Sequence, residues 1–505
     1  MKKLIIPILV FTTGLNLFAQ SNIENQIFDI GIESIESFRE FLSIKNDANF
    51  KNEMKPLIEW GINNFKKYGF EVERLETPEL PLLLASKVIS EDLNTLLIYL
   101  QFDGQPVDNS KWDQENPYKA VLKKRINNEY KIIDWSRLDN ITFDDIKKED
   151  LRIFARSASD AKGPVMMILN ALEIMERNNI ELEYNLKVIM DFEEEISSPN
   201  LADAVKKYSS KLKSDALLIF DGPKHPSNLP TLTFGARGIS DITLITYGPI
   251  VPQHSGHFGN YAPNPVFRMS EILSSMKDSD GRVTIPGFYD GIELDEKTLK
   301  ILAEVPDDEE KMMNDMQFKK PDNVGKNYQE SIQYPSINVR GIESGWVREE
   351  VRTIVPSECI AEIDVRLVLE SDPIRLHNLI KSHIQELGYY VIDRRPTKDE
   401  RLKHNKIVTF VSSFDYDAFR TDIESEIGKW LVKSLKKTFG IEPVKKRTSG
   451  GSVPISPFVN TLGIPAVTVP TVNQDNNQHS PNENIKIENY ITGIETYLGI
   501  LTDKF

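Results

Sequence analysis

The sequence predicts an α/β domain that is interrupted by an inserted α+β domain. Three short apolar runs, each followed by acidic or amide residues, indicate buried strands. These runs cover residues 96–100, 186–190 and 216–220. Between Thr231 and about residue 417, apolar and polar residues alternate instead, as in residues 239–245 and 360–367, and alternation is typical of strands with one face in water. The change of pattern predicts that the second domain is inserted into the first.

Helices and a further strand can be placed in order along the chain. Residues 27–68 carry apolar side chains at intervals of three and four, which is the spacing of amphipathic helix. A helix is also predicted after Lys162, because Pro164 suits a first turn and apolar residues follow it. Residues 424–439 are again amphipathic, and residues 466–469 form another apolar strand, so the first domain resumes there.

These elements give the predicted domain boundaries. The first domain is built of residues 21–232 and 418–505, and its strands alternate with helices. Its functional groups are therefore expected along the carboxyl edge of the sheet. Residues 233–417 form the inserted domain. Residues 103–155 and 281–340 are rich in polar side chains and are interpreted as excursions on the surface of the two domains.

The N-terminal residues 1–20 are typical of a secretory signal peptide. Lys2 and Lys3 precede an apolar run, and the small residue Ala19 offers a cleavage position. Pro7 and several polar residues interrupt the run, which argues against a membrane span. We therefore expect a secreted or periplasmic protein.

The charge composition of the chain argues against some classes of binding partner. The chain has 61 Lys and Arg residues against 76 Asp and Glu, a net charge of −15. This acidic balance argues against nucleic acid or a membrane as a partner. Cys359 is the single cysteine, so no intrachain disulfide can form. Stability must come from a buried core, for which the chain is long enough.

Acidic residues and a histidine suggest a metal site. Asp221 and the three glutamates of residues 193–195 each come shortly after a predicted strand. With Asp160 and His479 they supply what two divalent ions need: a bridging carboxylate, further carboxylate or imidazole ligands, and a free carboxylate that accepts a proton from water. Spacing alone leaves open the alternative that these acids are scattered over the surface.

A series of short motifs runs through nearly all of the predicted mature chain. The motifs are Phe102-Asp103-Gly104-Gln105-Pro106-Val107, Ala155-Arg156-Ser157-Ala158-Ser159-Asp160-Ala161-Lys162-Gly163, Glu194-Glu195-Ile196-Ser197-Ser198-Pro199-Asn200, Gly235-Ala236-Arg237-Gly238, His254-Ser255-Gly256-His257-Phe258-Gly259, Ile285-Pro286-Gly287-Phe288-Tyr289-Asp290, Gly450-Gly451-Ser452-Val453-Pro454 and His479-Ser480-Pro481-Asn482-Glu483-Asn484. In this order they resemble the motifs of the M20 family of metallopeptidases. The resemblance implies an α/β metallohydrolase catalytic domain with an inserted α+β lid or dimerisation domain.

The resemblance implies a role for each residue of the metal site. Asp160 would bridge two metal ions, Glu195 and His479 would complete one site, and Asp221 would belong to the other. Glu194 would be the general base that takes a proton from water and returns it to the leaving amine. The metal would be Zn²⁺, with one or two ions bound, and Co²⁺ or Mn²⁺ would suit the same ligands.

Further residues are assigned to catalysis and substrate binding by the same resemblance. Asp103 is placed among the catalytic residues. His254 would reach the active site of a partner subunit in a homodimer and stabilise the oxyanion. Arg366, Gly451 and Ser452 would hold the carboxylate of the substrate. From the pattern alone, Arg366 could also be a surface charge and His254 a loop residue.

Three positions depart from the family pattern, and one of them is Ser197, which replaces a glycine. Gln101 stands where the family has a histidine that partners the position of Asp221 on one metal, and an amide oxygen is a weak ligand beside imidazole. Ala161 stands where the family has an aspartate that orients a ligand. Two hypotheses remain open: an enzyme that hydrolyses a short peptide or an N-acyl amino acid, or a degenerate relative that binds such a molecule without cutting it.

Overall fold

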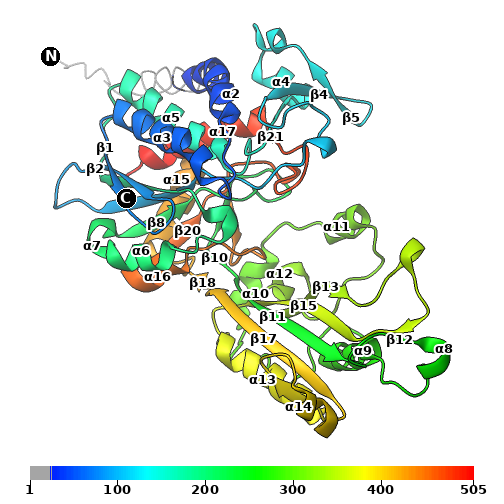
Figure 1. Cartoon of the computed structure of the whole chain (residues 1–505). Helices are drawn as coiled ribbons and strands as arrows, with labels where there is room; N and C mark the ends of the chain where they lie inside the picture. The colour runs from blue at the N-terminus through cyan, green and yellow to red at the C-terminus, as the bar shows by residue number, and fades with distance from the viewer. Residues whose placement is uncertain (1–22, 24) are drawn as a thin grey trace, which may run out of the picture. The chain divides into compact units, whose positions relative to one another are not determined.

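The computed structural model describes residue 23 and residues 25–505, and the predicted signal peptide lies outside these described residues. The chain divides into two compact units (Figure 1). Unit 1 contains the described residues up to Phe234, with Thr421–Lys445 and Pro457–Phe505. Unit 2 contains Gly235–Arg420 and Lys446–Ser456.

The segment Lys446–Ser456 differs from the predicted boundaries, which assign it to the first domain. Its backbone explains the difference. Ser449 forms a bridge with Ala236, and the Gly451 carbonyl accepts a hydrogen bond from the backbone N–H of Arg237 at 3.3 Å. These pairings tie the segment to the first strands of unit 2.

An eight-stranded mixed sheet forms the centre of unit 1, in the order β1-β2-β7-β3-β8-β20-β9-β19. The strands are β1 (Glu71–Leu75), β2 (Leu82–Lys87), β3 (Thr95–Gln101), β7 (Asn185–Asp191), β8 (Ala216–Ile219), β9 (Thr231–Thr233), β19 (Val444–Lys446) and β20 (Ala466–Thr468). The four predicted apolar runs are β3, β7, β8 and β20, and neighbours among them run parallel. Their carboxyl ends therefore meet at one edge of the sheet, as the sequence predicts.

The helices of unit 1 pack around this sheet. They are α2 (Ile35–Ser43), α3 (Lys55–Lys67), α5 (Lys162–Arg177), α6 (Leu201–Lys207), α7 (Ser209–Leu212), α15 (Glu426–Phe439), α16 (Ser456–Leu462) and α17 (Ile487–Leu501). The helices predicted after Lys162 and at residues 424–439 are confirmed as α5 and α15. The helical region predicted at residues 27–68 is interrupted after α2, where Asp47 forms a bridge with Gly104. Helix α5 packs against α17 and β3.

Unit 1 also contains a second sheet, which the sequence pattern does not predict. It has the order β21-β6-β4-β5 and consists of β4 (Val121–Ile126), β5 (Glu129–Ile133), β6 (Arg152–Phe154) and β21 (Asn484–Lys486), with α4 (Phe143–Glu149) between β5 and β6. Residues 103–155 are therefore more than a surface excursion. Their strands are short and carry several charges, and the fourth strand comes from a distant part of the chain, so local pattern does not reveal the sheet.

Unit 2 is built on a five-stranded sheet in the order β13-β15-β11-β17-β16. These strands are β11 (Gly238–Tyr247), β13 (Ser336–Glu343), β15 (Glu358–Leu367), β16 (Tyr390–Ile392) and β17 (Ile407–Tyr416). Helices α9 (Pro265–Met276) and α13 (Pro373–Glu386) contribute to one hydrophobic core with the buried side chains of β11 and β15. The alternation predicted for residues 239–245 is confirmed, because every second side chain there is buried. In residues 360–367 the alternation is interrupted at Asp364, which is buried between two buried neighbours.

Shorter elements complete unit 2. They are β10 (Gly235–Ala236), β12 (Gln253–His254), α8 (Ser255–Phe258), α10 (Glu296–Ala303), α11 (Glu309–Met316), α12 (Tyr328–Ser331), β14 (Ile354–Val355), α14 (Lys398–Lys403) and β18 (Phe419–Arg420).

In the part of the chain that the structure describes, no helix combines the length and the apolar character needed to cross a membrane.

Candidate active site

The carboxyl edge of the parallel strands in unit 1 carries the predicted acidic residues. Gln101 ends β3 opposite Asp191, which ends β7, and the backbone N–H of Phe102 donates to the Asp191 carbonyl at 2.8 Å. Asp103 is fully buried and accepts hydrogen bonds from the backbone N–H groups of Glu194 at 3.1 Å and Glu195 at 2.9 Å. The carboxylate of Asp103 thus fixes the turn that presents both glutamates.

Three of the predicted ligands converge on one small volume. Nε2 of His479 lies 3.1 Å from Oδ2 of Asp160 and 3.3 Å from Oε2 of Glu195. One ligand atom from each residue lies within 4.8 Å of the others. Tetrahedral zinc with ligand bonds of about 2.1 Å separates its ligand atoms by roughly 3.4 Å. The side chains of Asp160, Glu195 and His479 are therefore close enough together to hold a single divalent cation.

Two glutamines hold the carboxylates of this cluster. Nε2 of Gln105 donates to Oε2 of Glu195 at 2.8 Å, and the amide of Gln101 donates to Oδ1 of Asp160. The two carboxylate oxygens of Asp160 thus contact different residues: Oδ2 contacts His479 and Oδ1 contacts Gln101. The amide oxygen of Gln101 is buried and has no hydrogen-bond partner among the described residues, so it is available to a cation on that side.

The acidic groups perturb one another strongly. Burial and the neighbouring carboxylates of Asp221 and Glu195 raise the pKa of Glu194 well above its ordinary value. Burial and the charge of Asp160 raise the pKa of Glu195 to about 8 and that of Asp221 to about 7. The hydrogen bond to Asp160 raises the pKa of His479 to about 9, although burial opposes this shift. Such a cluster of like charges is what a divalent cation would relieve, and perturbation of this kind is typical of functional sites.

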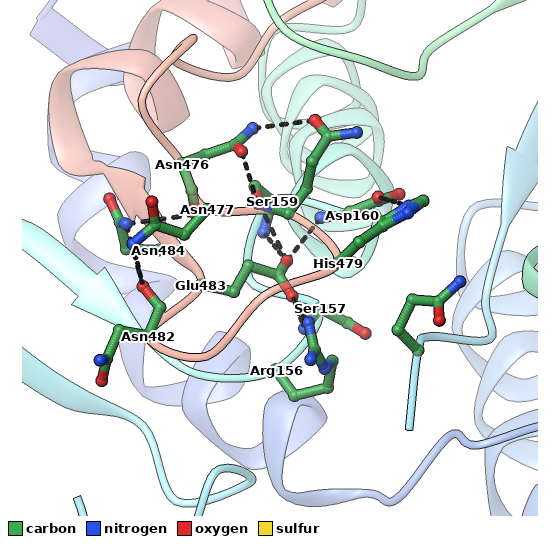
Figure 2. Close-up of polar contacts among 12 residues, drawn as sticks. Arg156, Ser157, Ser159, Asp160, Asn476, Asn477, His479, Asn482, Glu483 and Asn484 are labelled. Atoms are coloured by element: carbon green, nitrogen blue, oxygen red, sulfur yellow. Dashed lines mark hydrogen bonds and ion pairs between the residues drawn. The ribbon is translucent and has the colours of Figure 1, made fainter. Parts of the chain in front are cut away.

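The segment that carries Asp160 folds around a buried carboxylate, that of Glu483 (Figure 2). Oε1 of Glu483 accepts a hydrogen bond from the backbone N–H of Asp160 at 2.9 Å. The peptide bond between Asp160 and Ala161 is cis. Ala161 is buried just before α5, and its methyl group cannot orient a ligand as the family's aspartate would.

Sequence reasoning missed the residues that support the ligands. Glu483 lies inside the quoted motif from His479 to Asn484, and Gln105 lies inside the motif that contains Asp103, yet neither received a role. Both are polar residues within motifs whose other members contact the site, which is the signal that could have identified them. Asp191 is a third example: its buried carboxylate accepts hydrogen bonds from Tyr99 at 2.9 Å and from Ser198 at 2.6 Å.

The predicted substrate-binding residues lie in unit 2. Nη1 of Arg366 donates to Oγ of Ser452 at 2.8 Å, and Nε of Arg366 donates to Asp364 at 3.1 Å. The guanidinium of Arg366 is therefore held in place rather than free on the surface. Gly451 is exposed beside Ser452. His254 is also exposed, and its Nδ1 accepts a hydrogen bond from the backbone N–H of Gly256 at 3.0 Å at the start of α8.

Comparison with known proteins gives consistent matches. The sequence profile of Peptidase family M20/M25/M40 matches residues 134–503. The Cys-Gly metallodipeptidase dug1 of Schizosaccharomyces pombe is 23% identical to this chain, over 90% of this chain and 91% of its own length. The Beta-Ala-His dipeptidase of Homo sapiens is also 23% identical, over 92% of this chain and 89% of its own length.

Solved structures agree with these matches. An M20 family metallo-carboxypeptidase from Sulfolobus solfataricus superposes with a TM-score of 0.74 at 29% identity, covering 93% of this chain and 98% of its own. Human carnosine dipeptidase 1 superposes with a TM-score of 0.72 at 21% identity, covering 95% of this chain and 98% of its own. This chain thus belongs to Peptidase family M20/M25/M40 and is a metallopeptidase or amidohydrolase of that family.

Proposed function

We propose that this protein is an exported metal-dependent peptidase that hydrolyses the amide bond of a short peptide, in the first place a dipeptide, or of an N-acyl amino acid. The convergence of Asp160, Glu195 and His479 on a volume of cation size, beside Glu194, is the observation that carries the proposal. Relatives named as dipeptidases along almost the whole chain support the substrate class.

The chemistry follows from the groups that surround this volume. A bound divalent cation, Zn²⁺ or the similar Co²⁺ or Mn²⁺, would acidify water and polarise the scissile carbonyl. Glu194 accepts the proton from water and delivers it to the leaving amine. Burial and the carboxylates of Asp221 and Glu195 raise the pKa of Glu194, and a raised pKa makes a carboxylate a stronger proton acceptor. Asp103 keeps Glu194 in place through its backbone.

Unit 2 would supply recognition of the substrate. The guanidinium of Arg366, oriented by Asp364 and Ser452, would bind the free carboxylate, and the exposed Gly451 beside it leaves room for a ligand. In a homodimer, His254 would donate to the oxyanion in the partner's active site, and its exposure on unit 2 is compatible with that role.

The experiment that tests the function compares the wild type with Glu194→Gln in metal content and in hydrolysis of dipeptides and N-acetyl amino acids. We expect the wild type to bind metal and to hydrolyse at least one of these classes. Without the proton acceptor, Glu194→Gln should lose roughly 10²- to 10⁴-fold in kcat while it retains the metal.

Glu193→Gln is a matched control, because Glu193 contacts Asn200 rather than the ligand cluster and should leave kcat near the wild-type value. Full activity in Glu194→Gln would refute the assigned base. A wild type that holds no metal and cuts none of the substrates would favour the non-hydrolysing binder instead.

A further inference from the structure

The two ligands Asp160 and His479 come from segments that are far apart in the sequence, so something must fix one segment against the other. The strand pairing between β6 and β21 supplies the first connection, with Phe154 opposite Asn484. Beyond this pair, the backbone N–H of Ala155 donates to the Glu483 carbonyl at 3.1 Å. The chain that leads to Asp160 thus starts beside Glu483, four residues after His479.

The side chain of Glu483 then becomes the centre of the turn that ends at Asp160 (Figure 2). Its Oε1 accepts from the backbone N–H groups of Ser159 at 3.0 Å and Asp160 at 2.9 Å and from Oγ of Ser159 at 2.9 Å. Its Oε2 accepts from Nη1 of Arg156 at 2.7 Å and from the backbone N–H of Ser157 at 2.9 Å. Five donors therefore converge on one carboxylate that is 0% exposed.

Asn484 closes the loop that carries His479. Nδ2 of Asn484 donates to the carbonyls of Asn476 and Asn482, both at 3.2 Å, and Oδ1 of Asn484 accepts from Nη1 of Arg152 at 3.0 Å. These bonds join the two ends of the loop on either side of His479. A shift of Glu483 would therefore move the His479 loop and the Asp160 turn relative to each other.

We propose that Glu483 is a positioning residue for catalysis: its carboxylate, held by Arg156 and by the turn around it, sets the placement of Asp160 relative to His479 and so sets the affinity for the metal. The inference rests on the metal site of the proposed function. Groups that orient metal ligands commonly change the affinity for the ion when they are altered, because the ligands then adopt the binding geometry for a smaller fraction of the time.

The test is a titration of the metal-free protein with Co²⁺, whose visible absorption reports the geometry of its ligands. Glu483→Gln keeps the shape of the side chain but loses its charge and one acceptor. We expect the dissociation constant for Co²⁺ to rise roughly 10- to 100-fold and the absorption spectrum to change. In the loaded enzyme, kcat should fall while KM for a dipeptide stays near the wild-type value, since Glu483 contacts no substrate-binding residue named above.

Two further variants keep the inference falsifiable. Glu149→Gln breaks another arginine–carboxylate pair of unit 1, with Arg137, away from the ligands, and should leave Co²⁺ binding unchanged. Because Glu483→Gln leaves Arg156 buried without its partner, this variant could fail to fold. Ser159→Ala then decides the question: it removes one donor to Glu483 and should weaken Co²⁺ binding by a smaller factor.

The outcomes separate this inference from the function on which it rests. A folded Glu483→Gln with wild-type Co²⁺ affinity and spectrum would overturn the positioning role alone. If Glu483→Gln does not fold, unchanged Co²⁺ binding in Ser159→Ala would overturn it. A wild type that does not bind Co²⁺ would overturn the proposed function and this inference together.

Discussion

Gln101 ends β3 with its amide hydrogen-bonded to Asp160, the residue that the family resemblance assigns as a bridge between two metals. An amide N–H that occupies one oxygen of Asp160 competes with a cation for that oxygen. The amide oxygen of Gln101 remains without a partner and could itself bind a cation, but more weakly than imidazole. We therefore expect one strongly bound ion rather than two.

Gln101→His should restore the second metal position. We expect the metal content to rise from one equivalent to two and kcat to increase, because imidazole would join Asp160 and Asp221 as a ligand. Elemental analysis and calorimetric titration of the metal-free protein measure the stoichiometry. Gln101→Leu is the control, since it removes the hydrogen bond to Asp160 without adding a ligand, and it should hold one ion. Two equivalents in the wild type would mean that the Gln101 amide already coordinates.

Residue types and motif positions predicted three candidate ligands that lie close together, but not the residues that hold these ligands in place. Asp160, Glu195 and His479 were predicted as ligands, and the structure brings them together. Asp103 was predicted among the catalytic residues, and the structure shows it holding the backbone of the two glutamates. That contact could not be predicted, because hydrogen bonds to backbone groups depend on the path of the chain rather than on residue type.

At the scale of elements, long apolar runs were predictable and short charged strands were not. Strands β3, β7 and β8 are largely buried on both faces, so their sequences are mostly apolar, with Lys187 as the exception within β7. Strands β4 and β6 carry Lys123 and Arg152, whose charged groups are nevertheless buried and paired with Asp113 and with Asp150 and Asp475. A charged residue in a strand predicts a solvent-facing side chain unless its partner is known. The partner Asp475 lies far from Arg152 in the sequence.

The first turn of helix α5 packs closely against the turn that carries Asp160, and Gly163 is the residue at this contact. A Cβ atom added at Gly163 in its first turn would lie 2.4 Å from the Ala158 carbonyl oxygen and 3.0 Å from Cδ1 of Ile485. Gly163→Ala should therefore push the turn away from the helix, destabilise the protein by about 1–3 kcal/mol and weaken metal binding. Denaturant unfolding and the Co²⁺ titration measure the two effects.

Gly61, inside α3, is the matched control for Gly163. Its added Cβ atom would meet its nearest neighbours, Leu83, Met190 and Phe102, at 3.4 Å. Gly61→Ala should be neutral, or stabilising by up to about 1 kcal/mol, because alanine favours the helix. Equal stability and equal metal binding in both variants would show that the close approach at Gly163 does not constrain the turn.

At the scale of the whole molecule, the sheet of unit 2 has an outer strand with two exposed apolar side chains among polar ones. Strand β13 is an outer strand of its sheet, and Val339 and Ile342 on it are 41% and 57% exposed. An edge strand presents backbone N–H and C=O groups to which a strand of another chain can pair. This surface supports the proposed homodimer, in which His254 would serve the partner's active site.

Ile342→Lys should convert the dimer to a monomer, because it places a charge on the proposed interface. Sedimentation velocity of the wild type and the variant measures the change, and the activity should fall with the dimer. Ile132→Lys is the control, since Ile132 is 55% exposed on β5 of unit 1, away from that edge. A monomeric wild type at micromolar concentration would contradict the proposed assembly.

The class of fold, the central strands and the candidate metal ligands could be predicted from the amino-acid sequence. These follow from apolar periodicity and from residue types whose chemistry is local. Three further features become visible only in the folded chain: Glu483 binds the turn of Asp160, Gln101 donates to Asp160, and strands from residues 103–155 join β21 in a sheet. Each of these contacts joins segments that are distant in sequence. Their partners are selected by the packing of the whole unit, which no local pattern encodes.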